Sequence, residues 1–391
     1  MANTQIPQGH WQPGPLPKDI YYGSGCVARH LLFCLAPSSR VFVITNTSLS
    51  KTPLLPQLES ILGAQHAGTI SSIKQHVSLS DIEDALSTIL STTHTPTPIT
   101  LLSLGGGSAI DATKIISYKY HSATRSFLPH IAIPTTLSGA ECTPGGSYTI
   151  TEQSPTTPVT TKKAIIHPDL AISTIFYDPI YAAHTPPTLW LSTGIRALDH
   201  ATECMYHPLA AEVPWKALAL FAFSELLTCL PLSKAHPTDD NLTVRLMLAA
   251  YASSGFKGSN IGGELGLSHR LGHVLGSAYG IPHGITSCMT LGRVVCVKAR
   301  DRDAAAQIVR LIPGIEAGDG DGRLRTGDDY ADAVQVGKRI QGLARELGLE
   351  GKLGDYGVER DEVERIVRRV VGDEGDEREM KEVEEVVMRL F

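Results

Sequence analysis

One stretch of this chain constrains its fold more than any other: an apolar run that ends in glycines and continues as a helical pattern. It reads PITLLSLGGGSAIDATK, residues 98–114. Glycines permit close backbone approach and positive φ angles. The helix that follows would present free N–H groups and its positive dipole end to an anion. The spacing matches neither the Walker A motif nor GxGxxG, so two interpretations stay open, a pyrophosphate loop and a plain tight turn.

Strand-like and helix-like patterns alternate through the first half of the chain. Short runs of β-branched and apolar residues predict strands at residues 40–46, 130–136 and 173–179. Apolar residues at helical spacing predict a helix over 81–91, with Ser80 and Asp81 as capping candidates. This alternation favours an α/β layer with a parallel sheet.

The pattern changes near residues 179–188, where three prolines interrupt it. Beyond them, helical length and periodicity appear at residues 189–207, 215–230, 242–256 and 361–371. We therefore predict an α/β dinucleotide-binding domain over 1–180 and a helical catalytic domain over 181–391. Residues 313–329 are rich in glycine and charge, which predicts a surface loop.

Composition narrows the class of protein. A formal net charge of -6 argues against nucleic-acid binding. No apolar run approaches the roughly 20 residues that span a membrane, and the N-terminus lacks the basic and apolar regions of a signal peptide. The seven cysteines form no CxxC pair, which disfavours a disulfide framework or a thiolate zinc site. These features predict a cytoplasmic protein that acts on a small molecule.

Three histidines stand close together in LSHRLGHVLGSAYGIPHG, residues 267–284. His269 and His273 are four residues apart, which places them on one face of a helix, and His283 follows. Such a set is compatible with a metal site, a proton-transfer site or a polar seam in the core.

Several segments together resemble one family. GGGSAIDATK resembles the GGGS-x-x-D-x-x-K segment of iron-containing alcohol dehydrogenases, relatives of dehydroquinate synthase and glycerol dehydrogenase. Residues 132–144, AIPTTLSGAECTP, are similar to the second nucleotide segment of that family, and 266–276, GLSHRLGHVLG, look like a maleylacetate reductase segment. The resemblance covers roughly residues 20–300. It implies a dehydroquinate synthase-like fold: an α/β N-terminal nucleotide-binding domain plus an all-α C-terminal domain, with the active site in the cleft between them.

The resemblance also implies a cofactor, NADH or NADPH. By position, the cofactor-binding residues would be Asn46, Gly106, Gly107, Ser108, Asp111, Thr135, Thr136, Ser138 and Lys163, with Lys162 an equal candidate for the last. Asn46 stands where relatives that prefer NAD often carry an acidic residue, which would repel a 2′-phosphate. Asn46 would therefore tolerate NADPH, or it is simply a turn residue.

Metal-dependent members of the family use an aspartate, a histidine four residues later and two further histidines. The matching positions here are Arg196, His200, His269 and His283. A guanidinium cannot ligate a divalent cation and repels one. Asp199 would point about 100° away from His200 on a helix. We therefore expect no metal; if one binds, its ligands are the three histidines.

By likeness to maleylacetate reductases, the chain would transfer hydride from NAD(P)H to an unsaturated or oxo acid. His273 is then the candidate proton donor, because imidazole titrates near neutrality. Arg196 would polarise a substrate oxygen or bind a carboxylate. His200, His269 and His283 would contact the substrate or relay protons.

Three alternatives stay open at this point. One is a metal-dependent alcohol or aldehyde dehydrogenase that replaced its aspartate with another ligand. A second is a non-redox lyase, cyclase or isomerase on the same scaffold. The third is an inactive binding protein, which the intact glycine segment disfavours. The resemblance further implies a homodimer, with no nucleic-acid or membrane partner.

Overall fold

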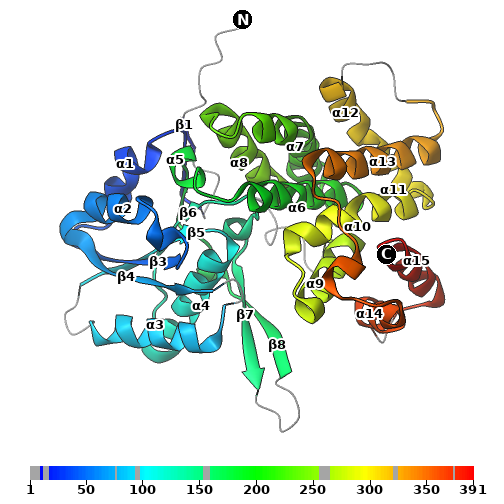
Figure 1. Ribbon diagram of the computed structural model, residues 1–391. Coiled ribbons are helices and arrows are strands. Elements are labelled where there is room, and N and C mark those ends of the chain that lie inside the picture. Colours follow the sequence, from blue (N-terminus) through cyan, green and yellow to red (C-terminus); the bar gives the residue numbers. More distant parts are fainter. Residues whose placement is uncertain are drawn as a thin grey trace, which may run out of the picture. The chain divides into compact units, whose positions relative to one another are not determined.

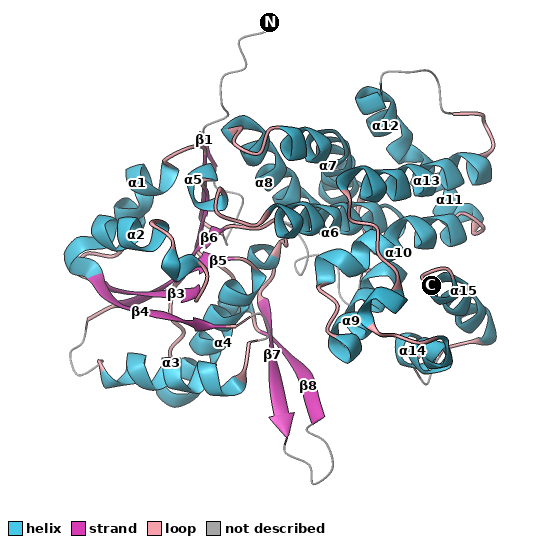
Figure 2. Cartoon of the chain, in the orientation of Figure 1, coloured by secondary structure: helices cyan, strands magenta, loops and turns pink. Residues whose placement is uncertain are grey.

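The computed structural model describes residues 9–11, 17–74, 77–92, 97–152, 159–254, 265–319, 325–372 and 375–391. Figures 1 and 2 show the chain coloured by sequence and by secondary structure. It forms two compact units. The first comprises residues 1–185 and 238–247, and the second comprises 186–237 and 248–391.

The first unit is built on a parallel sheet. Among the described residues, seven strands form this sheet in the order β1-β2-β9-β6-β5-β3-β4. Their bounds are β1 Gly9–Trp11, β2 Asp19–Tyr22, β3 Arg40–Asn46, β4 His66–Ile73, β5 Ile99–Gly105, β6 His130–Pro134 and β9 Thr174–Tyr177. Only β1 runs antiparallel to its neighbour. The strands and the parallel arrangement expected from the sequence are confirmed.

Helices cover both faces of this sheet, as Figure 2 shows. The helices that pack on it are α1 Cys26–His30, α2 Leu54–Leu62, α3 Leu79–Ser91, α4 Gly107–Thr124 and α5 Pro179–Ala182. Side chains alternate along a strand, so Val41 and Val43 of β3 join the core under α1 and α2. Phe42 and Ile44 join the core under α3 and α4. The sheet is therefore buried on both sides, which explains its continuous apolar strands.

Two local features of the first unit extend or correct the sequence prediction. An antiparallel hairpin, β7 Gly145–Glu152 with β8 Val159–Ile166, follows β6. The N-cap of α3 is Ser78, whose hydroxyl accepts a hydrogen bond from the Asp81 amide at 3.1 Å. The prediction of Ser80 or Asp81 as the cap was wrong, because the helix begins at Leu79, two residues before the predicted start.

The second unit is helical. Its helices are α6 Pro187–Tyr206, α7 Ala217–Ala235, α9 Leu267–Tyr279, α10 His283–Lys298, α11 Arg302–Ile308, α12 Ile312–Asp319, α13 Asp329–Leu347, α14 Val363–Val371 and α15 Glu377–Met388. Helix α8, Asp240–Ser254, has residues in both units. Every residue of α6 from 190 to 205 is buried, which is typical of a central core helix. Helices α9, α10, α14 and α15 share an apolar core of their own.

The structure corrects one sequence expectation for this unit. Residues 313–319, expected in a loop, belong to α12; 320–324 lie outside the described residues. Among the described residues, the segment Glu212–Ala235 is long and apolar enough to cross a membrane by length and composition only, a test that buried core helices also pass. Its buried side chains pack within this unit, against α6 among others.

Candidate functional site

The candidate cofactor residues of the first unit lie at the carboxyl ends of neighbouring strands. Asn46 ends β3, and the glycines 105–107 end β5 and begin α4. These two strands are adjacent and parallel. From β3 the chain proceeds to β4 on one side and then to β5 on the other. Such a reversal in an open α/β sheet is where ligands bind.

The glycine turn has no room for larger residues. Gly105 has φ 150°, and a Cβ there would lie 2.9 Å from the Ala109 Cβ. Gly106 is the N-cap of α4 and supplies no side-chain cap. A long helix that begins at a glycine N-cap, which carries no side chain, suits an anionic group.

The second nucleotide segment lies directly against this turn. The Thr135 amide donates to the Gly105 carbonyl at 3.1 Å. A Cβ on Gly106 would lie 2.8 Å from Thr136 Cγ2, and one on Gly107 would lie 3.3 Å from Ser138 Oγ. The fold therefore brings these predicted residues together, although they are about 30 positions apart in the sequence.

The remaining predicted cofactor residues have other surroundings. The Asn46 Oδ1 accepts hydrogen bonds from the Leu49 amide and the Ser48 hydroxyl, both at 2.9 Å, so Asn46 does shape a turn. The Asp111 Oδ2 accepts from the amide and hydroxyl of Ser147, at 3.1 and 2.9 Å. Ser108 is half-buried in the first turn of α4, and Lys163 is exposed on β8. A cofactor role stays a prediction for these four residues, as it does for the glycine turn and the segment 135–138.

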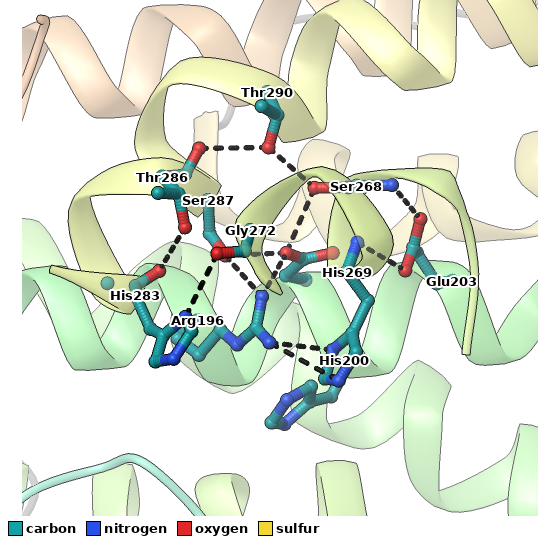
Figure 3. A network of polar contacts seen from close by, with 12 residues as sticks. Arg196, His200, Glu203, Ser268, His269, Gly272, His283, Thr286, Ser287 and Thr290 are labelled. Atoms are coloured by element: carbon teal, nitrogen blue, oxygen red, sulfur yellow. Dashed lines mark hydrogen bonds and ion pairs between the residues drawn. The ribbon is translucent and has the colours of Figure 1, made fainter. Parts of the chain in front are cut away.

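In the second unit, Arg196 lies at the centre of a buried polar network, shown in Figure 3. Its Nη1 is 3.3 Å from Asp199 Oδ2 and donates to Ser287 Oγ at 3.0 Å. Its Nη2 is 2.8 Å from Nδ1 and 3.4 Å from Nε2 of His269. The side chain of Arg196 is 7% exposed and that of Asp199 is fully buried. The guanidinium charge is therefore balanced inside the protein.

Hydroxyl groups complete the surroundings of Asp199. Its Oδ2 accepts from Ser287 Oγ at 2.6 Å and from Ser268 Oγ at 3.0 Å. Ser268 in turn lies 2.8 Å from Thr290 Oγ1. Burial raises the pKa of Asp199, whereas the charge of Arg196 and these hydrogen bonds oppose the rise. The charge of Arg196 thus favours the ionised form of this carboxyl group.

The histidines form a continuous series of rings on α6, α9 and α10. Ring centroids are 5.5 Å apart for His200 and His269, 4.7 Å for His269 and His273, and 5.5 Å for His273 and His283. The Nε2 atoms of His269 and His273 are 3.1 Å apart, which is hydrogen-bond distance. His200 Nδ1 is 2.7 Å from Ser254 Oγ. The structure therefore joins all four predicted histidines and Arg196 in one cluster.

Glu203, one turn beyond His200 on α6, fixes the start of α9. Its carboxylate accepts hydrogen bonds from the amides of Ser268 at 2.7 Å and His269 at 3.2 Å. Burial, together with the charge of Asp199, raises the pKa of Glu203 to about 8. A carboxyl group at a helix N-terminus satisfies amides that have no partner within the helix. Glu203 thereby holds the turn that carries His269.

Metal-dependent members of the family that the sequence resembles bind a divalent cation through the matching positions, so we compared this cluster with the needs of such an ion. A cation would need free lone pairs on the histidines, but both ring nitrogens of His269 already lie within hydrogen-bond distance of Arg196 or His273. A permanent positive charge stands at the position of the family's aspartate. Within the described parts of the chain, no group of three or more His, Cys, Asp or Glu is arranged to hold a metal. The residues present do not fit a divalent cation.

Sequence reasoning missed several members of this cluster. It assigned no role to Asp199, Glu203, Ser254, Ser268 or Ser287. The spacing of Arg196 and Asp199 is that of a helical i,i+3 ion pair, a signal that could have paired them. The serines come from other helices, so nothing local in the sequence points to them.

Comparison with known families covers nearly the whole chain. Residues 17–179 match the model of the iron-containing alcohol dehydrogenases, and residues 190–389 match that of the Fe-containing alcohol dehydrogenase family, C-terminal. A dehydrogenase of Alternaria alternata, ALT3, is 28% identical over 60% of this chain and 67% of its own length. A maleylacetate reductase of Sphingobium indicum is 27% identical over 58% of each. The chain thus aligns with between half and two thirds of the length of each of these two relatives.

Solved structures show the same fold. The maleylacetate reductase of Agrobacterium tumefaciens superposes with a TM-score of 0.74, at 22% identity and 95% coverage of both chains. A 1,3-propanediol oxidoreductase superposes with a TM-score of 0.82, at 19% identity, over 99% of this chain and 100% of its own. Together with the two family matches, these likenesses show that the chain belongs to the iron-containing alcohol dehydrogenase family, a family of oxidoreductases.

Proposed function

We propose that this protein is an NAD(P)H-dependent reductase, similar to maleylacetate reductases, that transfers hydride to an unsaturated or oxo acid without a metal ion. The observation that carries the proposal is the guanidinium of Arg196, held by Asp199 and Ser287 against the ring of His269. Relatives named maleylacetate reductase support the substrate class. The glycine turn and the segment 135–138 support the cofactor.

The reaction needs one hydride and one proton. Bound at the glycine turn and the segment 135–138, NAD(P)H would supply this hydride to the electrophilic carbon of the substrate and would become NAD(P)⁺. Negative charge then develops on the substrate oxygen, as an alkoxide or enolate, and is quenched by a proton from His273. His269 lies within hydrogen-bond distance of His273 and can restore that proton through the ring series.

Arg196 has two parts in this scheme. Its contact with His269 orients the ring beside His273. Its permanent charge stabilises the anion that develops in the transition state, a role that a fixed, preorganised charge performs well. Before the substrate binds, the carboxylate of Asp199 compensates the charge of Arg196. This pairing allows the guanidinium to stay buried.

Metal independence can be tested by a gain of function. Arg196→Asp places an aspartate four residues before His200, in the spacing that metal-dependent members use. We expect the purified wild-type protein to hold less than about 0.1 divalent metal per chain and the variant to take up metal when it is offered. Stoichiometric metal in the wild-type protein would contradict the proposal and favour the metal-dependent alcohol or aldehyde dehydrogenase.

The cofactor and the proton donor are tested on the same preparation. Titration with NADH and NADPH, followed by nucleotide fluorescence, should show binding to wild type, His273→Ala and Arg196→Ala alike. Turnover of an oxo acid should fall by about 10²–10⁴-fold in His273→Ala, whereas His236→Ala, at an exposed position, should keep wild-type turnover. Near wild-type kcat in both site variants would refute the assignment. Absence of nucleotide binding would favour a non-redox enzyme on the same scaffold.

A further inference from the structure

Lys114, on α4, is a fully buried cation to which the sequence interpretation gave no role. Its residue is 0% exposed. The Nζ atom donates to three backbone carbonyls: Ala140 at 2.6 Å, Thr143 at 2.6 Å and Gly145 at 2.8 Å. An ammonium group has three N–H donors, so each of them has a carbonyl acceptor.

Burying an ammonium group is costly unless its donors are satisfied. Burial lowers the pKa of Lys114, and the charges of Asp111 and Glu141 oppose that effect. The three carbonyls belong to a stretch of six residues that turns around the ammonium group. Without a cation at its centre, carbonyl dipoles that converge in this way would repel one another. The ammonium group therefore stabilises this turn by donating to the converging carbonyl groups.

The same turn continues the segment that contains the candidate cofactor residues Thr135, Thr136 and Ser138. Before it, the Thr135 amide donates to the Gly105 carbonyl. After it, the amide and hydroxyl of Ser147 donate to Asp111. Lys114 thus holds the middle of a segment whose two ends are fixed to the glycine turn and to α4. Loss of Lys114 would free that middle part and leave both ends in place.

We propose that Lys114 is a positioning residue for the dinucleotide: it fixes the turn 140–145 and thereby the geometry of the segment 135–138 beside the glycine turn. The inference rests on the proposed cofactor site. It adds a residue that touches no cofactor and acts through the backbone of the segment that would.

The test compares Lys114→Met with Lys119→Met. Methionine keeps most of the length of lysine but removes the charge and the donors. Lys119 lies on the same helix and is only half-buried, so it is a matched control. Dissociation constants for NADH and NADPH are measured by fluorescence titration on the folded fraction of each protein, together with amide hydrogen exchange of residues 139–146.

We expect Lys114→Met to raise the cofactor dissociation constant by between about tenfold and a hundredfold, because a small misplacement of contacting groups has effects of that size. Exchange at 139–146 should accelerate, and Lys119→Met should match wild type. A dissociation constant within twofold of wild type would overturn the inference, even if the variant were less stable, because stability alone does not alter affinity in the folded fraction.

Two further measurements keep the test decisive. If Lys114→Met does not fold, Lys114→Gln replaces it, since an amide retains two N–H donors without the charge; its dissociation constant should then lie above that of wild type. Failure of the wild-type protein to bind either nucleotide would refute the proposed function itself, an outcome distinct from unaltered binding by the variants.

Discussion

Replacing Arg196 by methionine should destabilise the helical unit, and by more at high pH than at low pH. The guanidinium is the cationic partner of Asp199 in a pair whose side chains are 7% and 0% exposed. Methionine fills much of the same volume but leaves the carboxylate with only serine hydroxyls. Removing one partner of a buried ion pair typically costs about 3–5 kcal/mol. We expect the free energy of unfolding to fall by that amount near pH 8.

The pH dependence follows from Asp199. Burial raises its pKa in the folded protein above the ordinary value of 3.8, and the charge of Arg196 counteracts the rise. Without Arg196 the pKa of Asp199 rises further. When the pKa of an acid is higher in the folded protein than in the unfolded chain, the unfolded chain releases the proton more easily. The free energy of unfolding therefore falls as the pH rises through the folded pKa. The cost of Arg196→Met should therefore shrink toward pH 5, by up to about 1.4 kcal/mol per pH unit.

Tryptophan fluorescence in urea can measure this effect. Trp190 and Trp215 are buried in the helical unit, and a Trp11→Phe background removes the remaining tryptophan. Arg345→Met is the matched control, since Arg345 and Glu350 form an exposed pair at 65% and 57% side-chain exposure; such pairs contribute less than about 1 kcal/mol. In Arg196→Met with Asp199→Asn, the part of the pH dependence that comes from Asp199 should disappear, and Glu203, whose pKa Arg196 also lowers, accounts for what remains. A cost under about 1 kcal/mol at both pH values would refute the electrostatic argument.

Three other substitutions test separate parts of the structure. Asn46→Asp keeps the acceptor that forms the turn with Leu49 and adds a charge that repels a 2′-phosphate; the ratio of NADPH to NADH affinity should fall by at least about tenfold in fluorescence titrations. Gly106→Ala would place a Cβ 2.8 Å from Thr136 Cγ2, so nucleotide affinity should drop while the urea midpoint of the helical unit stays unchanged; full affinity would speak against this turn as the pyrophosphate site. Ile366→Ala opens a cavity under α14, where Ile366 is 0% exposed. It should cost about 2–5 kcal/mol in urea unfolding, with unaltered nucleotide binding; a loss below 1 kcal/mol would contradict the packing described.

Much of the architecture could be predicted because its signals are local. The run 40–46 is apolar and β-branched and becomes β3 with the same bounds. Val363, Ile366, Val367 and Val370 repeat at helical spacing and are the buried face of α14. Where the local signal was ambiguous, prediction failed. Residues 313–319 carry glycine and charge, yet they form α12, because tertiary contacts override weak propensity.

The cofactor segments show the limit of spacing arguments. The glycines of 105–107 indicated a turn or a phosphate loop, and the sequence could not choose between them. The structure places that turn at the point where the strand order reverses and packs Thr136 against Gly106. Those two facts favour the phosphate loop, and both depend on which strands become neighbours.

By itself, the sequence determined many of the elements, their alternation, the family resemblance and the presence of Arg196 at the position of the aspartate that the resemblance implies, since each of these is written in consecutive residues. Only the tertiary structure decided what Arg196 touches. Ser287 and His269 come from α10 and α9, and they meet Arg196 because helix packing brings together positions more than 70 residues apart. The same holds for Lys114. The residue itself is part of the glycine-rich segment GGGSAIDATK, but its three carbonyl partners lie 26 to 31 residues further along the chain. Hydrogen bonds within a helix or a strand follow a fixed spacing, whereas those between elements follow from packing, and packing is a property of the whole fold.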